Sequence, residues 1–146
     1  MTPTLLGRWQ TRLFLMGTVG LLMTLLFCGG AFGNPAGGVY FAILVYLILF
    51  GMGWDCLYIS IQGFRWDQDW PALFQWLAAL WEALFFILLR IVFGVELPYT
   101  DLNGAEFPLG WFICHYLLVW AAVFIASQSL MRLLFPHWRF HGGEWF

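Results

Sequence analysis

Four long apolar stretches alternate with short polar or turn-rich segments along this chain. A helix needs about 20 mostly apolar residues to cross a bilayer core of roughly 30 Å. Spans of this length run over residues 13–31, 39–61, 71–93 and 110–135. The pattern predicts an all-α membrane protein, a four-transmembrane-helix bundle in which residues 1–146 form a single integral membrane domain.

The segments between the spans differ in character. Residues 33–38, GNPAGG, are dense in turn-forming residues, which predicts a tight hairpin between the first two spans. Residues 94–110 form a longer connection that carries three acidic residues and no basic one.

The arginines predict which side of the membrane each segment faces. Cytoplasmic segments of membrane proteins carry an excess of Lys and Arg. Arginines precede the first span, lie between the second and third, and end or follow the fourth: Arg8, Arg12, Arg65, Arg132 and Arg139. Arg90, near the outer end of the third span, is the exception. The distribution predicts that both termini and the 62–70 loop are cytoplasmic.

Composition also indicates a membrane protein. The chain is 62% hydrophobic and 10% charged, with a mean hydropathy of +0.81, whereas a soluble domain is roughly half apolar and a quarter charged. The net charge of −2 provides no basic surface for nucleic acid. We expect the lipid bilayer as a partner, no nucleic acid, and a location in the bacterial plasma membrane or an internal membrane derived from it.

The first span also has features of a secretory signal peptide, because two arginines precede its apolar run. However, Phe27 occupies the position where a cleavage site before Cys28 requires a small residue. We therefore expect the segment to be retained. The cysteines, Cys28, Cys56 and Cys114, form no CxxC pair, which excludes a simple dithiol relay. No cofactor is predicted.

Each span carries a stripe of small or polar residues on an otherwise bulky surface. Helices in lipid associate through close packing of such residues and through a few interhelical hydrogen bonds. The stripes consist of Gly17, Gly20, Thr24 and Cys28; Gly51 and Asp55; Gln75, Ala78 and Glu82; and His115, Val119, Ala122, Ala126 and Ser129. We expect these stripes to face the interior of the bundle.

Glu82 is the most informative polar residue, because it falls near the middle of the third span. An unpaired charged carboxylate there costs several kcal/mol, so it marks a functional hypothesis. One interpretation is a carboxylate in a proton or ion pathway. The other is a protonated Glu82 that is hydrogen-bonded to a neighbouring helix, with Thr24 as a candidate partner. In that case Glu82→Gln should retain function.

Three further polar residues lie within the spans. Asp55 falls near the cytoplasmic end of the second span, where we expect Ser127 and Gln128 to reach it. Arg90 and His115 fall at similar depth near the outer face. They could form a pair or bind an anion together, and Arg90 could also extend outward to the acidic 94–110 loop.

The stretch RWDQDWP, residues 65–71, concentrates charge between two tryptophans. Its favoured interpretation is an interface anchor and helix cap. Arg65 would meet lipid headgroups, Trp66 and Trp70 would lie at the interface, and Asp69 would cap the third span. The alternative is a divalent-cation site formed by Asp67 and Asp69.

The C-terminal tail offers one more candidate site. His137 and His141 would share a helix face and could bind a metal with Glu144 as a third ligand. Pro136 and the Gly142–Gly143 pair bracket a segment of barely one turn, so no metal site is predicted. We expect the tail to lie on the cytoplasmic leaflet or to dock against a partner.

These features suggest a structural or accessory subunit of a larger membrane complex, with membrane-protein partners or a homo-oligomer. An alternative is an oligomeric small transporter or channel that uses the intramembrane Glu82. A weaker alternative is an enzyme that acts on a lipid-borne substrate at the cytoplasmic interface. An enzyme is the less favoured class.

Overall fold

The structure is a computed structural model that describes residues 3–102, 104–138 and 140–144. It is mostly helical, at 67%, and four of its helical stretches are long and apolar enough to cross a membrane. The elements in chain order are α1 (Leu5–Leu15), the π-helix η1 (Met16–Gly20), α2 (Leu21–Cys28), α3 (Val39–Gly63), α4 (Ala72–Ile91), β1 (Asp101–Leu102), β2 (Ala105–Glu106), α5 (Leu109–Gln128) and α6 (Leu130–Leu134). The prediction of four long apolar helices is confirmed.

The first helix begins well before the predicted start of its span at residue 13. Thr4 is the N-cap residue of α1, and its hydroxyl accepts a hydrogen bond from the Gly7 amide at 3.1 Å. Arg8 and Arg12 therefore lie inside the helix, and not before it as the sequence predicted. The continuous apolar run begins only at Leu13, so the sequence placed both arginines in the segment before the span.

One wide turn interrupts the first helical stretch. Residues Met16–Gly20 form a π-helix between α1 and α2, with i→i+5 hydrogen bonding. Gly20 faces inward, where a Cβ would touch Leu44 and Val119 at 3.4–3.5 Å. Gly17 is exposed, so the predicted small-residue stripe was wrong at this position. The wide turn changes the phase of the helix between its two halves.

The main core lies between α2, α3 and α5. Its largest fully buried side chains include Phe27, Tyr40 and Ile43, and Phe86 from α4 stacks on Phe112 from α5 at 4.7 Å between ring centroids. In contrast, only Ala79 and Phe86 are buried along α4. Helix α4 is therefore the most peripheral of the four long helical stretches.

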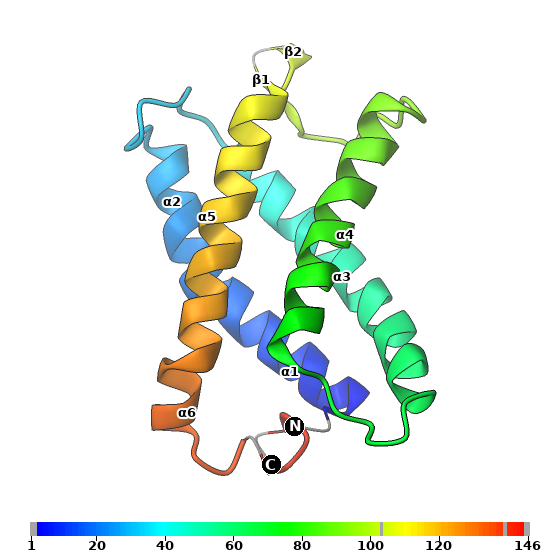
Figure 1. Cartoon of the computed structure of the whole chain (residues 1–146). Coiled ribbons are helices and arrows are strands. Elements are labelled where there is room, and N and C mark those ends of the chain that lie inside the picture. The colour runs from blue at the N-terminus through cyan, green and yellow to red at the C-terminus, as the bar shows by residue number, and fades with distance from the viewer. Residues whose placement is uncertain (1–2, 103, 139, 145–146) are drawn as a thin grey trace.

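The two ends of the described chain meet at one end of the bundle, together with the α3–α4 loop (Figure 1). The Thr4 amide donates to the Gly142 carbonyl at 2.9 Å, and Trp138 Nε1 donates to Thr11 Oγ1 at 2.9 Å. A Cβ on Gly7 would lie 2.2 Å from the Gly142 oxygen. The tail thus packs on α1 of its own chain, a contact that the sequence did not predict.

The opposite end of the bundle holds the two connections that the sequence placed outside. The α2–α3 connection and the β1–β2 hairpin lie there together (Figure 1). In the hairpin Asp101 pairs with Glu106 and Leu102 with Ala105 in antiparallel register. The four-helix arrangement thus has two distinct ends, one with the acidic hairpin and one with the packed tail.

Candidate functional site

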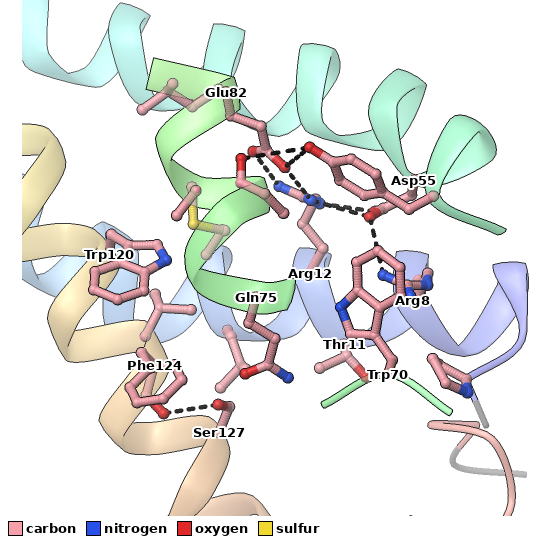
Figure 2. Close-up of a pocket in the computed structure, with 18 of the residues that line it drawn as sticks. Arg8, Thr11, Arg12, Asp55, Trp70, Gln75, Glu82, Trp120, Phe124 and Ser127 are labelled. Atoms are coloured by element: carbon pink, nitrogen blue, oxygen red, sulfur yellow. Dashed lines mark hydrogen bonds and ion pairs between the residues drawn. The ribbon is translucent and has the colours of Figure 1, made fainter. Parts of the chain in front are cut away.

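Charged side chains from three helices meet inside the bundle. Arg12 of α1 donates to both oxygens of Asp55 on α3, at 2.8 and 3.0 Å, and to both oxygens of Glu82 on α4, at 2.9 and 3.0 Å (Figure 2). The side chain of Asp55 is 3% exposed, that of Glu82 11% and that of Arg12 18%. One guanidinium therefore joins three helices through two bidentate ion pairs.

The interior of the bundle allows these charges because they compensate one another. Arg8 and Arg12 contribute two positive charges, and Asp55 and Glu82 contribute two negative ones. Desolvation of ions costs several kcal/mol each, and only close, well-oriented partners offset that cost. We call these four residues the charge cluster. Its balance means that loss of any one member leaves a charge without compensation.

Arg8 is the least completely paired member of the charge cluster. Its Nη1 lies 3.9 Å from Asp55 Oδ1, and its Nη2 donates to Gln62 Oε1 at 3.3 Å. The guanidinium carbon lies 4.1 Å from the centroid of Trp70, a cation–π contact. Its Nε is buried and has no hydrogen-bond partner within the described part of the chain.

Gly51 provides the space that the Arg12 side chain occupies. A Cβ at this position would lie 2.1 Å from Arg12 Nη1 and 2.5 Å from Arg12 Cζ. Gly51 is one helical turn before Asp55 on α3, so the guanidinium passes over the glycine to reach the carboxylate. The predicted stripe of Gly51 and Asp55 does face inward, and its function is to admit Arg12.

Two tyrosines, one on α3 and one on α5, bond to backbone carbonyls of α4. Tyr58 Oη is 3.4 Å from Glu82 Oε1 and from the Ala78 carbonyl. Tyr116 Oη donates to the Ala79 carbonyl at 2.6 Å. These polar contacts attach α4 to α3 and α5, together with the ring contacts that its aromatic side chains make with both helices.

A cavity of about 210 Å³ lies beside the charge cluster. The cluster forms one wall, and Trp120 and Phe124 of α5 lie across from it, with Gln75 between them (Figure 2). On the α4–α5 side Trp76 packs against Trp120 with ring centroids 4.2 Å apart, and Gln128 Nε2 donates to Gln75 Oε1 at 3.2 Å. The cavity also reaches Pro3 and Trp138 at the end of the bundle where the tail packs.

The sequence singled out Glu82 and Asp55, and the structure brings them together. Their predicted partners were wrong. Glu82 was assigned a neutral hydrogen bond with Thr24, but it pairs with Arg12. Asp55 was assigned to Ser127 and Gln128, but it also pairs with Arg12.

His115 and Arg90 do not form the predicted pair. Thr24 Oγ1 and His115 Nε2 lie 3.0 Å apart, and both residues are fully buried. His115 Nδ1 has no hydrogen-bond partner among the described residues. No hydrogen bond or ion pair joins the half-buried Arg90 to His115 or to the acidic loop residues in the described ranges.

The RWDQDWP stretch is a local ion-paired turn. Arg65 donates to both oxygens of Asp67 at 2.8 and 2.9 Å, and these bonds lower the pKa of Asp67 to about 2. Trp66 is 96% exposed, whereas Trp70 packs on Arg8. The N-cap residue of α4 is Pro71, whose side chain makes no capping bond, and the cap of α4 by Asp69 stays a prediction.

The tail candidates lie around a second cavity, whose lining includes His137, Trp138, His141 and Glu144. The rings of His137 and His141 are 6.4 Å apart between centroids, and Glu144 Oε1 accepts a hydrogen bond from Thr4 Oγ1 at 2.5 Å. Across the residues that the structure describes, no group of three or more His, Cys, Asp or Glu side chains is arranged to hold a metal.

The site residues that sequence reasoning missed are Arg8 and Arg12. Both were counted as residues outside the membrane. One signal could have revealed their role, because residues four apart lie on the same face of a helix. Two arginines at that spacing, together with two intramembrane carboxylates of opposite charge, were enough to suggest an internal charge cluster.

Comparison with known proteins finds no matching family model, no matching curated protein and no matching solved structure. The charge cluster and its cavity are therefore the features of the molecule on which a functional proposal rests.

Proposed function

We propose that this chain is an integral membrane protein with both termini on the cytoplasmic side. Its four long apolar helices support insertion. Arg8 and Arg12 belong to the charge cluster and no longer count as flanking residues. Arg65 and Arg132 still favour a cytoplasmic position for the end of the bundle where the tail packs, by the positive-inside rule.

Within the membrane we propose that the chain is a structural or accessory subunit of a larger complex. The observation that carries this proposal is the internal pairing of Glu82. Both of its oxygens accept hydrogen bonds from Arg12, and Arg12 is also held by Asp55. A carboxylate in a transport path must leave an oxygen open to the transported species, whereas Arg12 donates to both oxygens of Glu82. The geometry therefore favours a role in holding helices together.

A transporter formed by oligomerisation is the second candidate, and the cavity beside the charge cluster favours it. A polar wall next to a cavity that reaches one end of the bundle is what one half of a transport path requires. An interfacial enzyme has weaker support, because Arg65 already occupies both oxygens of Asp67, the first residue of its candidate metal site.

Extraction from native membranes in a mild detergent tests the proposal. We expect the chain to migrate in a large assembly with the same partner proteins in several detergents. A monodisperse species of protomer size in all of them would overturn the proposal. In a parallel measurement, a proton or ion flux across liposomes that contain only this purified chain would support the transporter instead.

A further inference from the structure

The cavity beside the charge cluster has two chemically different walls. Arg8, Arg12, Asp55 and Glu82 form the polar wall, and side chains such as Leu15, Met16, Trp120, Val123 and Phe124 form the apolar one. If water filled the cavity, the aromatic side chains would stay exposed to it. If a purely apolar molecule filled the cavity, it would offer the arginines no hydrogen-bond acceptor. A molecule with one polar end and one apolar end fits both walls.

The polar end of such an occupant has a defined charge. Arg8 is the member of the cluster whose positive charge has no close carboxylate, since its shortest distance to one is 3.9 Å. That carboxylate, on Asp55, already accepts two shorter bonds from Arg12. The Arg8 Nε is a buried donor without a partner among the described residues. A buried donor of this kind normally has a partner, and an anionic oxygen is the strongest one.

Trp70 leaves the edge of the Arg8 guanidinium as the part that can bind an anion, and Gln75 lines the same cavity. Trp70 covers the face of the Arg8 guanidinium, so further bonds must form in the plane of the group, as they do with carboxylate and phosphate. The Gln75 side chain extends into the cavity between the two walls (Figure 2), where its oxygen is bonded to Gln128 and its amide nitrogen is a second donor.

We propose that this cavity binds an acidic amphiphile, namely an acyl chain that ends in a carboxylate or phosphate group. The anionic group lies at Arg8, and the chain runs along Leu15, Trp120 and Phe124. The cavity of about 210 Å³ exceeds the roughly 150 Å³ that suffices for benzene, so it holds a segment of one chain. The inference rests on the membrane insertion proposed above, because Arg8, in the first turn of α1, would then lie at headgroup depth.

The test uses the full chain purified in a neutral detergent. Binding is measured by titration with short-chain phosphatidylglycerol, short-chain phosphatidylcholine, decanoate and inorganic phosphate, with thermal unfolding as the readout. We expect phosphatidylglycerol or decanoate to raise the unfolding temperature by several degrees. Phosphatidylcholine and inorganic phosphate should produce little change. The relative effect of the two acidic amphiphiles identifies phosphate or carboxylate as the preferred headgroup.

Two variants locate the site, and a third is the control. Arg8→Gln should weaken binding of the acidic amphiphile at least tenfold, and Ala78→Phe should weaken it by filling the cavity from α4. Arg90→Gln removes an arginine at the other end of the bundle and should leave binding unchanged. A brominated acyl chain should quench tryptophan fluorescence, and Trp120→Phe should reduce that quenching.

Several outcomes would overturn the inference. Equal stabilisation by phosphatidylcholine would show that charge is not recognised. An equal effect of inorganic phosphate alone would show a simple anion site, and equal losses in Arg8→Gln and Arg90→Gln would show unspecific attraction. These binding measurements use the purified chain alone. A negative result would therefore count against the lipid site and not against the accessory-subunit proposal, which is tested by extraction with partners. A chain that needs no detergent to stay soluble would refute membrane insertion itself.

Discussion

Two of the buried polar clusters in the described part of the chain are built in opposite ways. The charge cluster joins α1, α3 and α4 beside a cavity, with Arg12 and Glu82 retaining some exposure. The second cluster is the neutral pair of Thr24 and His115, which joins α2 to α5 and has no exposed surface. The molecule thus keeps its full charges next to the open space and uses a neutral hydrogen bond where the core is closed.

The difference shows what holds each helix. Around Thr24 and His115 the rings of Phe27 and Tyr40 pack within 5.0–5.3 Å of the imidazole, so apolar packing accompanies the hydrogen bond. Along helix α4 only Ala79 and Phe86 are buried, most of its ring contacts with α3 and α5 lie at the half-exposed surface, and Glu82 lies at its centre. We therefore expect α4 to depend on charge pairing and α2 to depend on close packing. Substitutions at the two clusters test this contrast, and the half-exposed Arg65–Asp67 pair, which lies outside both, provides a reference for a small effect.

Arg12→Met should produce the largest loss of stability. It removes the common partner of Asp55 and Glu82 and leaves two carboxylates that compete for Arg8. Loss of one partner from a buried ion pair costs about 3–5 kcal/mol. Unfolding of the purified protein in mixed micelles measures this loss. The triple variant Arg12→Met, Asp55→Asn, Glu82→Gln should recover much of the stability, and a single variant as stable as the wild type would contradict the charge cluster.

Glu82→Gln should be the next most damaging change. It preserves shape but leaves an excess positive charge, and hydrogen bonds to charged groups contribute about 1.5–3 kcal/mol. The sequence alone predicted that glutamine would be tolerated here, so this measurement discriminates between the sequence and the structure. The control is Glu96→Gln in the exposed loop, which should unfold like the wild type. Equal behaviour of the two variants would favour a neutral Glu82.

Gly51→Ala tests whether the Arg12 guanidinium requires the space above Gly51 to reach Asp55. The added Cβ would overlap the guanidinium, so Arg12 must move away from Asp55. Overpacking of this kind costs about 1–3 kcal/mol. The matched control is Gly53→Ala on the same helix, where a Cβ meets nothing within 4 Å, and which should be neutral or slightly stabilising. Stability measured by micellar unfolding should separate the two, and a reversed order would contradict the proposed path.

Thr24→Val tests the neutral cluster. Valine keeps the shape of threonine but removes its hydroxyl, so His115 loses its hydrogen bond while the aromatic packing remains. Hydrogen bonds between membrane helices contribute about 0.6 kcal/mol on average, and we expect a loss of that order in the same unfolding assay. If the loss equalled that of Arg12→Met, the contrast between the two clusters would fail.

The smallest effect concerns the pH dependence of the Arg65–Asp67 turn. The pKa of Asp67 in the folded state, about 2, lies below its ordinary value of 3.8. The pair therefore stabilises the fold above about pH 4 and loses that contribution as the pH falls through about 2. Between about pH 8 and pH 5 the difference in unfolding temperature between wild type and Asp67→Asn should stay constant and small, because exposed pairs contribute little. A difference that changes across that range would contradict this assignment.

The sequence predicted the helices better than it predicted their contacts. Apolar length alone located four long helices, and the position of Glu82 and Asp55 within the predicted spans marked them correctly as groups in the interior of the bundle. The partner of both was missed because Arg12 is near the end of an apolar run, where hydropathy cannot distinguish an arginine at the surface from one inside. The partner of His115 was missed because it depends on how each helix is rotated about its axis.

In the first helical stretch, the rotation of α2 relative to α1 is set by the π-helix at Met16–Gly20. Arg12 and Thr24 are twelve residues apart, which in an uninterrupted α-helix places them about 120° from each other. The wide turn contains one extra residue, which reduces that angle by about 100°. Arg12 and Thr24 therefore lie about 20° apart around the helix axis. The number of residues between Arg12 and Thr24 therefore matters as much as which residues they are. Deletion of a single residue here would leave every side chain present but turn one half of the helix away from its neighbours, whereas the α2–α3 connection can change length without that penalty.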